Sequence, residues 1–161
     1  MRKKIAILGS TGSIGTSALD VIKNFKDSFE VTALSADLNI ELLAKQAHAF
    51  KPRVVCIGDS SALRETKMLV PSGTKIVSGS AGLEEIVSRG DVDMVVLAIS
   101  GTPCLVPLVR SIENKKRIAL ANKEALISAG PLVKRLAEKN GVEIVPIDSE
   151  HSAIFPCLSG R

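Results

Sequence analysis

The sequence predicts an α/β fold in which helices cover both faces of a doubly wound, mostly parallel sheet. Apolar runs of strand length alternate with segments of helical spacing along nearly all 161 residues, as expected of repeated strand–helix–strand units. Hydrophobic residues make up 45% of the chain, but aromatic residues only 2%. A core of Val, Ile, Leu and Ala is typical of a parallel sheet that is buried on both faces.

Seven short apolar segments bounded by turn residues are predicted strands. They are residues 5–8, 30–34, 53–57, 75–77, 94–99, 117–121 and 142–146. The run 94–99 is apolar without interruption, which is typical of a central strand in a parallel sheet.

Six helices are predicted between these strands from their apolar spacing. They are residues 14–25, 40–50, 61–70, 81–88, a helix that begins at about residue 103, and 131–140. Asn39 suits an N-cap, Pro103 a first helical turn, and Gly141 a C-cap. Ligands of such sheets bind beyond the carboxyl ends of the strands, so functional residues are expected at that edge.

The first strand runs directly into Gly9-Ser10-Thr11-Gly12-Ser13-Ile14-Gly15, with a glycine at every third position. Glycine lets a phosphate approach backbone N–H groups at the positive end of the following helix. The spacing differs from the G-x-G-x-x-G dinucleotide fingerprint, and a plain glycine turn is the alternative. With the predicted fold, the loop indicates a Rossmann-like nucleotide site.

The end of the second strand normally sets the preference between NAD and NADP. An acidic residue there binds the ribose 2′-hydroxyl of NAD, whereas a basic residue suits the 2′-phosphate of NADP. Here Asp37 has no adjacent base, and Ser35 or Asn39 can donate hydrogen bonds to either group. Taken alone, the segment favours NAD, although a solvated Asp37 without a cofactor role is the alternative.

A polar cluster, Asn122-Lys123-Glu124, follows the sixth strand. Lys123 can hold a substrate phosphate or oxyanion as a point charge. Asn122 can bind the nicotinamide or ribose of a cofactor, and Glu124 can orient either group. The alternative is a helix start that Asn122 caps.

A second cluster, Asp148-Ser149-Glu150-His151, follows the last strand. In an extended strand the side chains of Asp148 and Glu150 point the same way. Their oxygens suit a hard cation such as Mg²⁺ or Mn²⁺, but two side chains cannot complete its coordination. His151 faces the other way and is interpreted as a structural residue.

Charge and cysteine content exclude several classes of partner. The formal net charge is +4, but the basic residues are dispersed, which suits a phosphorylated small molecule better than nucleic acid. The lack of aromatics also argues against binding of single strands. The three cysteines lack metal-site spacing and indicate a reducing, cytoplasmic setting. No apolar stretch is long enough for a membrane span.

Together, the glycine loop, the segment Leu120-Ala121-Asn122-Lys123-Glu124 and the segment from Pro146 to Phe155 resemble the 1-deoxy-D-xylulose 5-phosphate reductoisomerase family. The resemblance covers essentially the whole chain. It implies an oxidoreductase of non-mevalonate isoprenoid biosynthesis that rearranges and reduces 1-deoxy-D-xylulose 5-phosphate to 2-C-methyl-D-erythritol 4-phosphate. It further implies NADPH and a divalent metal (Mn²⁺, Mg²⁺ or Co²⁺) as cofactors, a cytoplasmic location, and a homodimer for the full-length enzyme.

The resemblance also implies roles for individual residues. It assigns NADPH binding to Thr11, Gly12, Ser13, Ile14, Asn39, Asn122 and Glu124. It assigns substrate binding to Lys123, Ser149 and Glu150, of which Lys123 and Glu150 are catalytic, and metal binding to Asp148 and Glu150.

The sequence departs from the family pattern at two points. Family members usually have Gly and then Lys or Arg where this chain has Asp37-Leu38, so the expected partner of the 2′-phosphate is missing. They are also considerably longer, and we therefore expect residues 1–150 to be the NADPH-binding domain and 151–161 the start of a truncated catalytic domain, inactive alone. The alternatives are a stand-alone dinucleotide-binding, redox-sensing module and another glycine-loop dehydrogenase, such as one acting on amino-acid semialdehydes.

Overall fold

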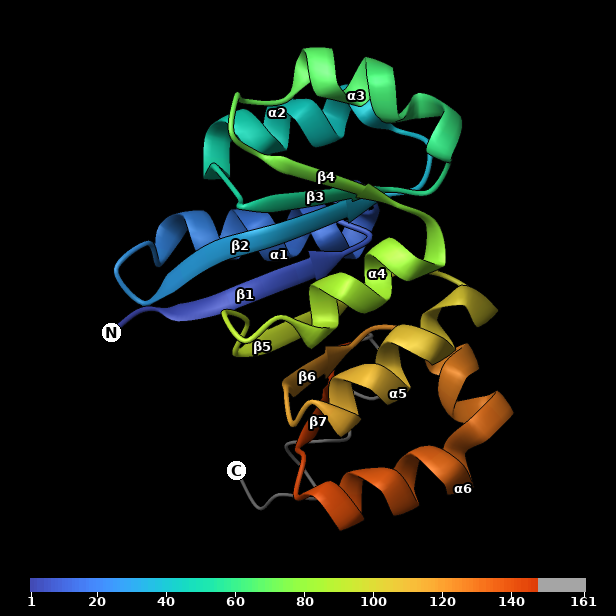
Figure 1. The fold of residues 1–161 in the computed structure, drawn as a ribbon. Coiled ribbons are helices and arrows are strands. Elements are labelled where there is room, and N and C mark those ends of the chain that lie inside the picture. The colour runs from blue at the N-terminus through green and yellow to red at the C-terminus, as the bar shows by residue number, and fades with distance from the viewer. Residues whose placement is uncertain (148–161) are drawn as a thin grey trace.

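The computed structural model describes residues 1–147 and contains one parallel sheet (Figure 1). Within the described residues, the sheet has the strand order β4-β3-β2-β1-β5-β6-β7, and every neighbouring pair is parallel. The strands are β1 (Lys3–Leu8), β2 (Phe29–Ala36), β3 (Val54–Ile57), β4 (Lys75–Ser78), β5 (Met94–Leu97), β6 (Arg117–Leu120) and β7 (Ile144–Pro146).

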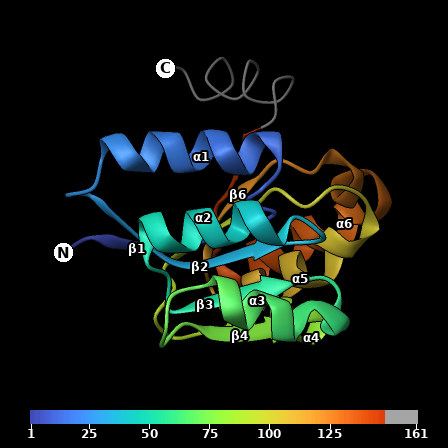
Figure 2. The same cartoon turned by 90° about the horizontal axis from the view of Figure 1, so that it is seen from above.

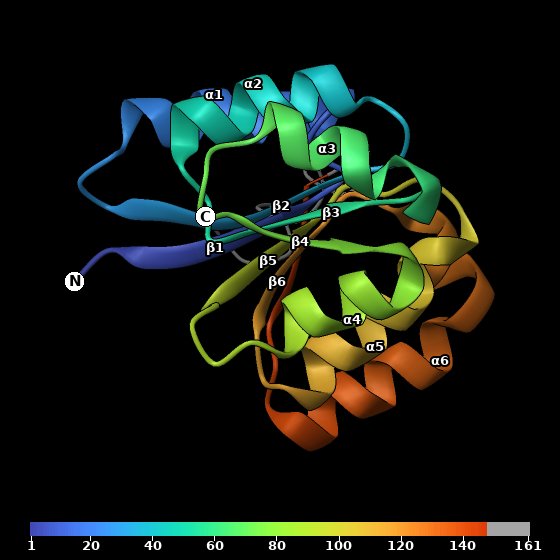
Figure 3. The same cartoon turned by 45° about the horizontal axis from the view of Figure 1, so that its top comes forward.

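The chain winds outward from β1 to β4 and then crosses back to place β5 on the other side of β1. One face of the sheet carries α1 (Ser13–Asn24), α2 (Ile40–Phe50) and α3 (Leu63–Leu69), and the other carries α4 (Gly79–Ser88), α5 (Leu105–Glu113) and α6 (Lys123–Asn140) (Figure 3). Short 3₁₀ turns, Ser60–Ala62 and Thr102–Cys104, precede α3 and α5. The predicted doubly wound, Rossmann-like fold is confirmed, and its switch point lies between β1 and β5.

Alternating side chains of β1 supply both halves of the core. Ile5 and Ile7 pack in the cluster beneath α1 and α2, with Leu19 and Leu43. Ala6 and Leu8 pack in the opposite cluster, which includes residues of α4, α5 and α6. Because β1 is buried on both faces, it fixes the point at which the following loop emerges. Viewed from above, β1 and β2 start at the edge where the N-terminus lies (Figure 2).

The last helix is longer than its sequence pattern indicates. α6 begins at Lys123, after the N-cap Asn122, and the part of it that follows the kink contains the helix that we predicted at 131–140. The helix is kinked at Ala129, where φ is −140° and ψ is 22°. Pro131 lacks an N–H, so one hydrogen bond of the helix is missing in the turn that contains the kink. The predicted C-cap at Gly141 is confirmed, with φ of 65°.

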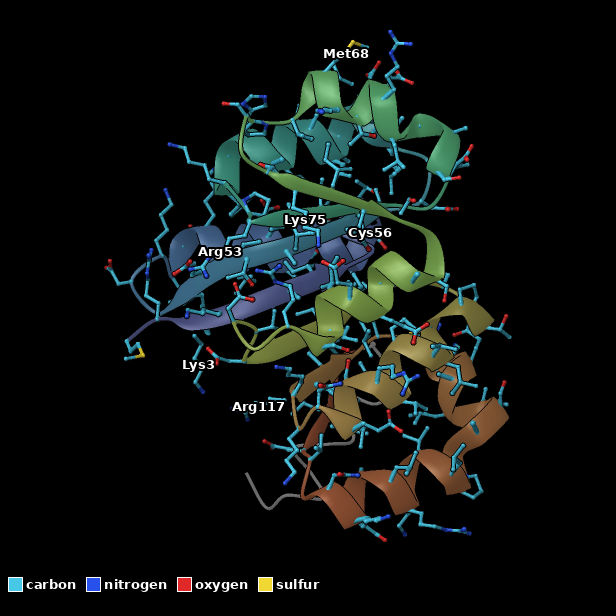
Figure 4. All side chains as sticks on the ribbon, viewed as in Figure 1. Lys3, Arg53, Cys56, Met68, Lys75 and Arg117 are labelled. Atoms are coloured by element: carbon cyan, nitrogen blue, oxygen red, sulfur yellow. The ribbon has the colours of Figure 1, made fainter. Side chains whose placement is uncertain are left out.

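Charged side chains meet at the amino ends of the strands, where Lys3, Arg53 and Arg117 lie along one edge (Figure 4). Asp91 accepts two hydrogen bonds from Arg89, at 2.7 and 2.8 Å, and one from Arg53 at 2.8 Å. These charged hydrogen bonds, those from Arg89 above all, lower the pKa of Asp91 below its ordinary value of 3.8.

The basic segment Lys115-Lys116-Arg117 is partly built into this edge. Lys116 is 8% exposed, and its Nζ donates to the carbonyl oxygens of Arg89 and Val92, both at 2.7 Å. Burial lowers the pKa of Lys116. Arg117 forms an ion pair with Glu143 at 2.9 Å. Among the described residues, no helix is both long and apolar enough to span a membrane.

Asp91→Asn is expected to lower the free energy of unfolding by about 1 kcal/mol at pH 7, because three charge-assisted hydrogen bonds lose their anionic acceptor. Since the folded-state pKa of Asp91 is lowered, its contribution is present above the unfolded-state pKa and is lost as the pH falls through the folded-state value. Denaturant unfolding measured in steps from pH 7 down to pH 2 should therefore show the difference between the two proteins shrinking in acid. Asp20→Asn, on the exposed side of α1, is the control, and a difference that stays constant over the whole series would contradict the assignment.

Candidate functional site

Two cavities lie at the carboxyl edge of the sheet and meet at its switch point. The larger, of about 360 Å³, extends toward the ends of β2 and β3. The smaller, of about 240 Å³, extends toward the end of β6 and the start of α6. Both are lined by Gly12 and by the segment 98–100 after β5. This is the place where a doubly wound sheet binds an extended ligand.

The three glycines of the first loop serve different purposes. Gly9 has a φ of 83°, and a Cβ there would lie 2.5 Å from the carbonyl oxygen of Ala98. A Cβ on Gly15 would collide with the backbone of Gly9 and Ser10. Gly9 and Gly15 therefore allow β1, β5 and α1 to pack closely. A Cβ on Gly12 would meet only the Gly9 carbonyl oxygen, at 3.5 Å, so this glycine instead keeps the space over both cavities open.

Buried hydrogen bonds hold this loop against β2 and α2. The Gly9 N–H donates to Ser35 Oγ at 2.9 Å, and the Ser10 N–H donates to the Ser35 carbonyl oxygen at 2.8 Å. Ser10 Oγ donates to Gln46 Oε1 at 2.7 Å, and Gln46 Nε2 donates to the Ser10 carbonyl oxygen at 2.8 Å. Ser10, Ser35 and Gln46 are all nearly inaccessible to solvent. The sequence pattern did not predict this network. Gln46 was a possible signal, because it is a polar residue among the apolar positions of the helix 40–50.

The N-terminus of α1 has the properties of an anion site. Its N-cap, Gly12, has extended geometry and makes no side-chain cap. The nearby hydroxyls of Thr16 and Ser17 donate to carbonyl oxygens of the same turn, including that of Ser13. The first N–H groups of a helix have no intrahelical acceptor and carry the positive end of its dipole. The predicted residues Thr11, Ser13 and Ile14 thus form a donor cradle beside the cavities, while Gly12 donates its own N–H to the Gly9 carbonyl oxygen at 3.1 Å.

The segment after β2 borders the larger cavity. Asp37 is exposed and lines the cavity, while Leu38 is 76% exposed. Asn39 is confirmed as the N-cap of α2, because its Oδ1 accepts a 3.0 Å hydrogen bond from Leu42 N–H.

Asn122, Lys123 and Glu124 line the smaller cavity. Asn122 is 3% exposed, and its Nδ2 donates to the carbonyl oxygens of Ile99 and Gly101, at 2.7 and 2.9 Å. Its Oδ1 accepts from Ala125 N–H at 2.7 Å. The alternative interpretation of Asn122 as a helix cap is confirmed, and its side chain also ties α6 to the loop after β5. Lys123 and Glu124 are exposed in the first turn of α6.

Cys56 and Cys104 are buried and reduced. Burial, helped by the charges of Glu85 and Glu124 respectively, raises the pKa of both thiols to about 12. At neutral pH both are therefore protonated and poor nucleophiles, although Cys56 lines the larger cavity.

The predicted metal and substrate residues Asp148, Ser149 and Glu150 lie outside the described residues, as does the predicted domain boundary at residue 150. Within residues 1–147, no group of three or more His, Cys, Asp or Glu side chains could hold a metal ion. Ile147 is the last described residue, and its N–H donates to the Leu120 carbonyl oxygen at 2.9 Å. The predicted acidic segment thus follows directly on a residue held at the end of β6.

A parallel sheet with a glycine loop, an open helix N-terminus and paired cavities at its switch point defines a nucleotide-binding domain of the doubly wound class. Residues 5–130 match the family model described as "1-deoxy-D-xylulose 5-phosphate reductoisomerase". The chain belongs to this family.

Known 1-deoxy-D-xylulose 5-phosphate reductoisomerases resemble the chain in sequence and structure. The reductoisomerase of Thermoanaerobacter pseudethanolicus is 49% identical over 159 residues, covering 99% of this chain and 41% of that protein. The enzyme from Zymomonas mobilis in complex with NADPH superposes with a TM-score of 0.93 at 36% identity, covering 98% of this chain and 41% of that one. A DOX-P reductoisomerase complex with NADPH, fosmidomycin and magnesium has a TM-score of 0.92 at 40% identity, covering 96% and 38%. The chain thus spans about two fifths of the length of its relatives.

Asn122→Asp should lower the free energy of unfolding by about 2 kcal/mol, because the carbonyls of Ile99 and Gly101 lose their donors and face a carboxylate. If Asn122 acted only as a cap, Asp would replace it without loss, since both residues cap well. Asn39→Asp is the matched control, with an expected change below about 0.5 kcal/mol. Equal stabilities of the two variants in denaturant unfolding would argue against the tie between α6 and the loop.

Proposed function

We propose that the chain is the NADPH-binding part of an enzyme that rearranges and reduces 1-deoxy-D-xylulose 5-phosphate to 2-C-methyl-D-erythritol 4-phosphate in non-mevalonate isoprenoid biosynthesis. The observation that carries the proposal is the meeting of two cavities over Gly12, beside the uncapped N-terminus of α1. A dinucleotide has two halves joined by a pyrophosphate, and this edge offers two cavities joined by an anion site. The NADPH complexes among the similar structures support the choice of cofactor.

The donor cradle fits the pyrophosphate without any basic side chain. Thr11, Ser13 and Ile14 would hold it through backbone N–H groups, and Gly12 would contribute by leaving room for close approach. The hydrogen bonds that Ser35 accepts from Gly9 N–H and Ser10 N–H fix the position of the cradle before any ligand arrives. A preformed site loses less conformational entropy on binding than a mobile loop.

The remaining cofactor residues fall on the two sides of the cradle. Asn39 would donate from its Nδ2 on the side of β2, because its Oδ1 is engaged with Leu42. On the other side, Glu124 would orient the nicotinamide half. Both Nδ2 hydrogens of Asn122 are engaged by Ile99 and Gly101, so Asn122 would act by holding the wall of the smaller cavity. When bound, NADPH supplies the hydride for the reduction.

The substrate would bind next to the smaller cavity. Lys123, in the exposed first turn of α6, would stabilise a substrate oxyanion as a point charge and act as a catalytic residue. From the sequence, Ser149 would contact the substrate, and Asp148 and Glu150 would bind Mn²⁺, Mg²⁺ or Co²⁺, with Glu150 also catalytic. Such a metal polarises a bound carbonyl as a Lewis acid. The magnesium complexes among the similar structures support the choice of a divalent metal.

The full-length protein would act as a cytoplasmic homodimer on a small phosphorylated sugar, without nucleic acid or membrane partners. Residues 1–150 would form the NADPH-binding domain and 151–161 the start of the catalytic domain, so that the chain alone binds cofactor without turnover. Family membership favours this function over the alternative of a stand-alone redox-sensing module.

Gly12→Val should abolish NADPH binding by the 161-residue chain, because the branched side chain fills the space needed by the pyrophosphate. Calorimetric titration with NADPH measures the effect, and circular dichroism checks that the variant is folded. Gly90→Val is the control, since a Cβ at this exposed position meets no atom within 4 Å. Tight NADPH binding by a folded Gly12→Val variant would refute the cradle.

Asp148→Asn, made in a full-length member of the family that carries this segment, should remove metal-dependent turnover, because an amide lacks the charge that a hard cation requires. Glu143→Gln is the control, because Glu143 is exposed and pairs with Arg117 at the start of β6. The rate of NADPH oxidation is measured across a range of Mn²⁺ concentrations. Unchanged activity in the Asp148 variant would contradict its role as a ligand.

A further inference from the structure

The larger cavity has an unusual charge for a site that is to hold NADPH. Of the described residues that line it, Asp37 and Cys56 have ionisable side chains, and the Cys56 thiol is protonated because burial raises its pKa to about 12. Asp37 is thus the charged residue of this lining, which includes no Lys or Arg among residues 1–147. A ribose 2′-phosphate normally pairs with a basic side chain at the end of the second strand.

The carboxylate of Asp37 lies between the ends of β2 and β3. A Cβ added to Gly58 would collide with Asp37 Oδ1, so the carboxylate lies directly over the Gly58 backbone. The Gly58 N–H donates to the carbonyl oxygens of Ala36 and Asp37, at 3.0 and 3.1 Å. The absence of a side chain on Gly58 thus leaves room for the Asp37 carboxylate at the rim of the cavity.

The two cofactors meet this carboxylate differently. The 2′-hydroxyl of NADH can donate a hydrogen bond to it, as an acidic residue in this position does in NAD-binding sheets. A 2′-phosphate is repelled instead. Because Asp37 is exposed to water, this repulsion is weak: at a separation of about 4 Å it lowers the affinity for the phosphate by only about tenfold. Asn39 Nδ2 and the positive end of α2 offset part of that repulsion, since both favour an anion.

We propose that Asp37 is a specificity residue that makes this site accept NADH alongside NADPH. The inference rests on the proposed function, because it requires the adenosine ribose to occupy the larger cavity. It concerns the 2′ position alone and leaves the pyrophosphate cradle and the nicotinamide side unchanged.

The test is a calorimetric titration of the 161-residue chain with NADPH and with NADH, each followed to saturation. The two dissociation constants should lie within about tenfold of each other, because Asp37 favours the hydroxyl of NADH only weakly from its exposed position and no cation holds the phosphate of NADPH. Asp37→Asn keeps the shape and removes the charge, so the ratio of the NADH to the NADPH constant should rise about tenfold. Asp20→Asn, an identical change on the exposed side of α1, should leave the ratio unchanged.

Leu38→Arg provides a second variant at a side chain that is 76% exposed and whose replacement leaves the core intact. It should raise NADPH affinity about tenfold relative to NADH by adding the missing cation. NADPH binding more than about 100-fold tighter than NADH in the unmodified chain, or an unchanged ratio in Asp37→Asn, overturns the inference and leaves the proposed function standing. Failure of both nucleotides to bind overturns both.

Discussion

Hydrogen bonds from β2 and α2 position the anion site of this chain. Ser35 accepts hydrogen bonds from the N–H groups of Gly9 and Ser10, the first two residues of the loop. Gln46, on α2, exchanges two further hydrogen bonds with Ser10. Ser10, Ser35 and Gln46 are shielded from water and Gly9 is partly buried, so an unmade bond among the buried groups would leave a desolvated polar atom and cost about 1–3 kcal/mol. The loop therefore has one favourable arrangement, and its N–H groups are aimed before a ligand binds.

The opposite wall of the site is also held by hydrogen bonds and close packing. Asn122 joins the start of α6 to the carbonyls of Ile99 and Gly101, while Gly9 lets the first loop approach Ala98 closely. The segment after β5 is thus fixed from both sides. Since this segment lines both cavities, its position determines how the two halves of a dinucleotide are spaced. A side chain buried for structural reasons can in this way shape a binding site without touching the ligand.

Local chemistry made most of the fold predictable, and long-range contacts limited the prediction of the site. Apolar runs and caps such as Asn39 and Gly141 were sufficient to predict the strands and most helices. At α6 they predicted the part that follows the kink, 131–140, but not the turns from Lys123 to the kink. The glycine loop was found from its spacing, but the bonds between Ser10 and Gln46 join residues 36 positions apart, and no local pattern encodes such a pair. Sequence also left open whether Asn122 binds a cofactor or caps a helix, because both roles need the same amide.

The two edges of the sheet differ in the kind of electrostatic interaction that they contain. At the amino edge, full charges pair with one another, as Asp91 does with Arg89 and Arg53. The buried ammonium group of Lys116 donates hydrogen bonds to two carbonyl oxygens there. At the carboxyl edge, the pyrophosphate cradle consists of backbone dipoles, which serve any dinucleotide alike. Selection between cofactors must then come from side chains beyond the cradle. Because Asp37 lies outside the hydrogen-bond network of Ser35 and Gln46, a change at residue 37 can alter cofactor preference without disturbing the phosphate site.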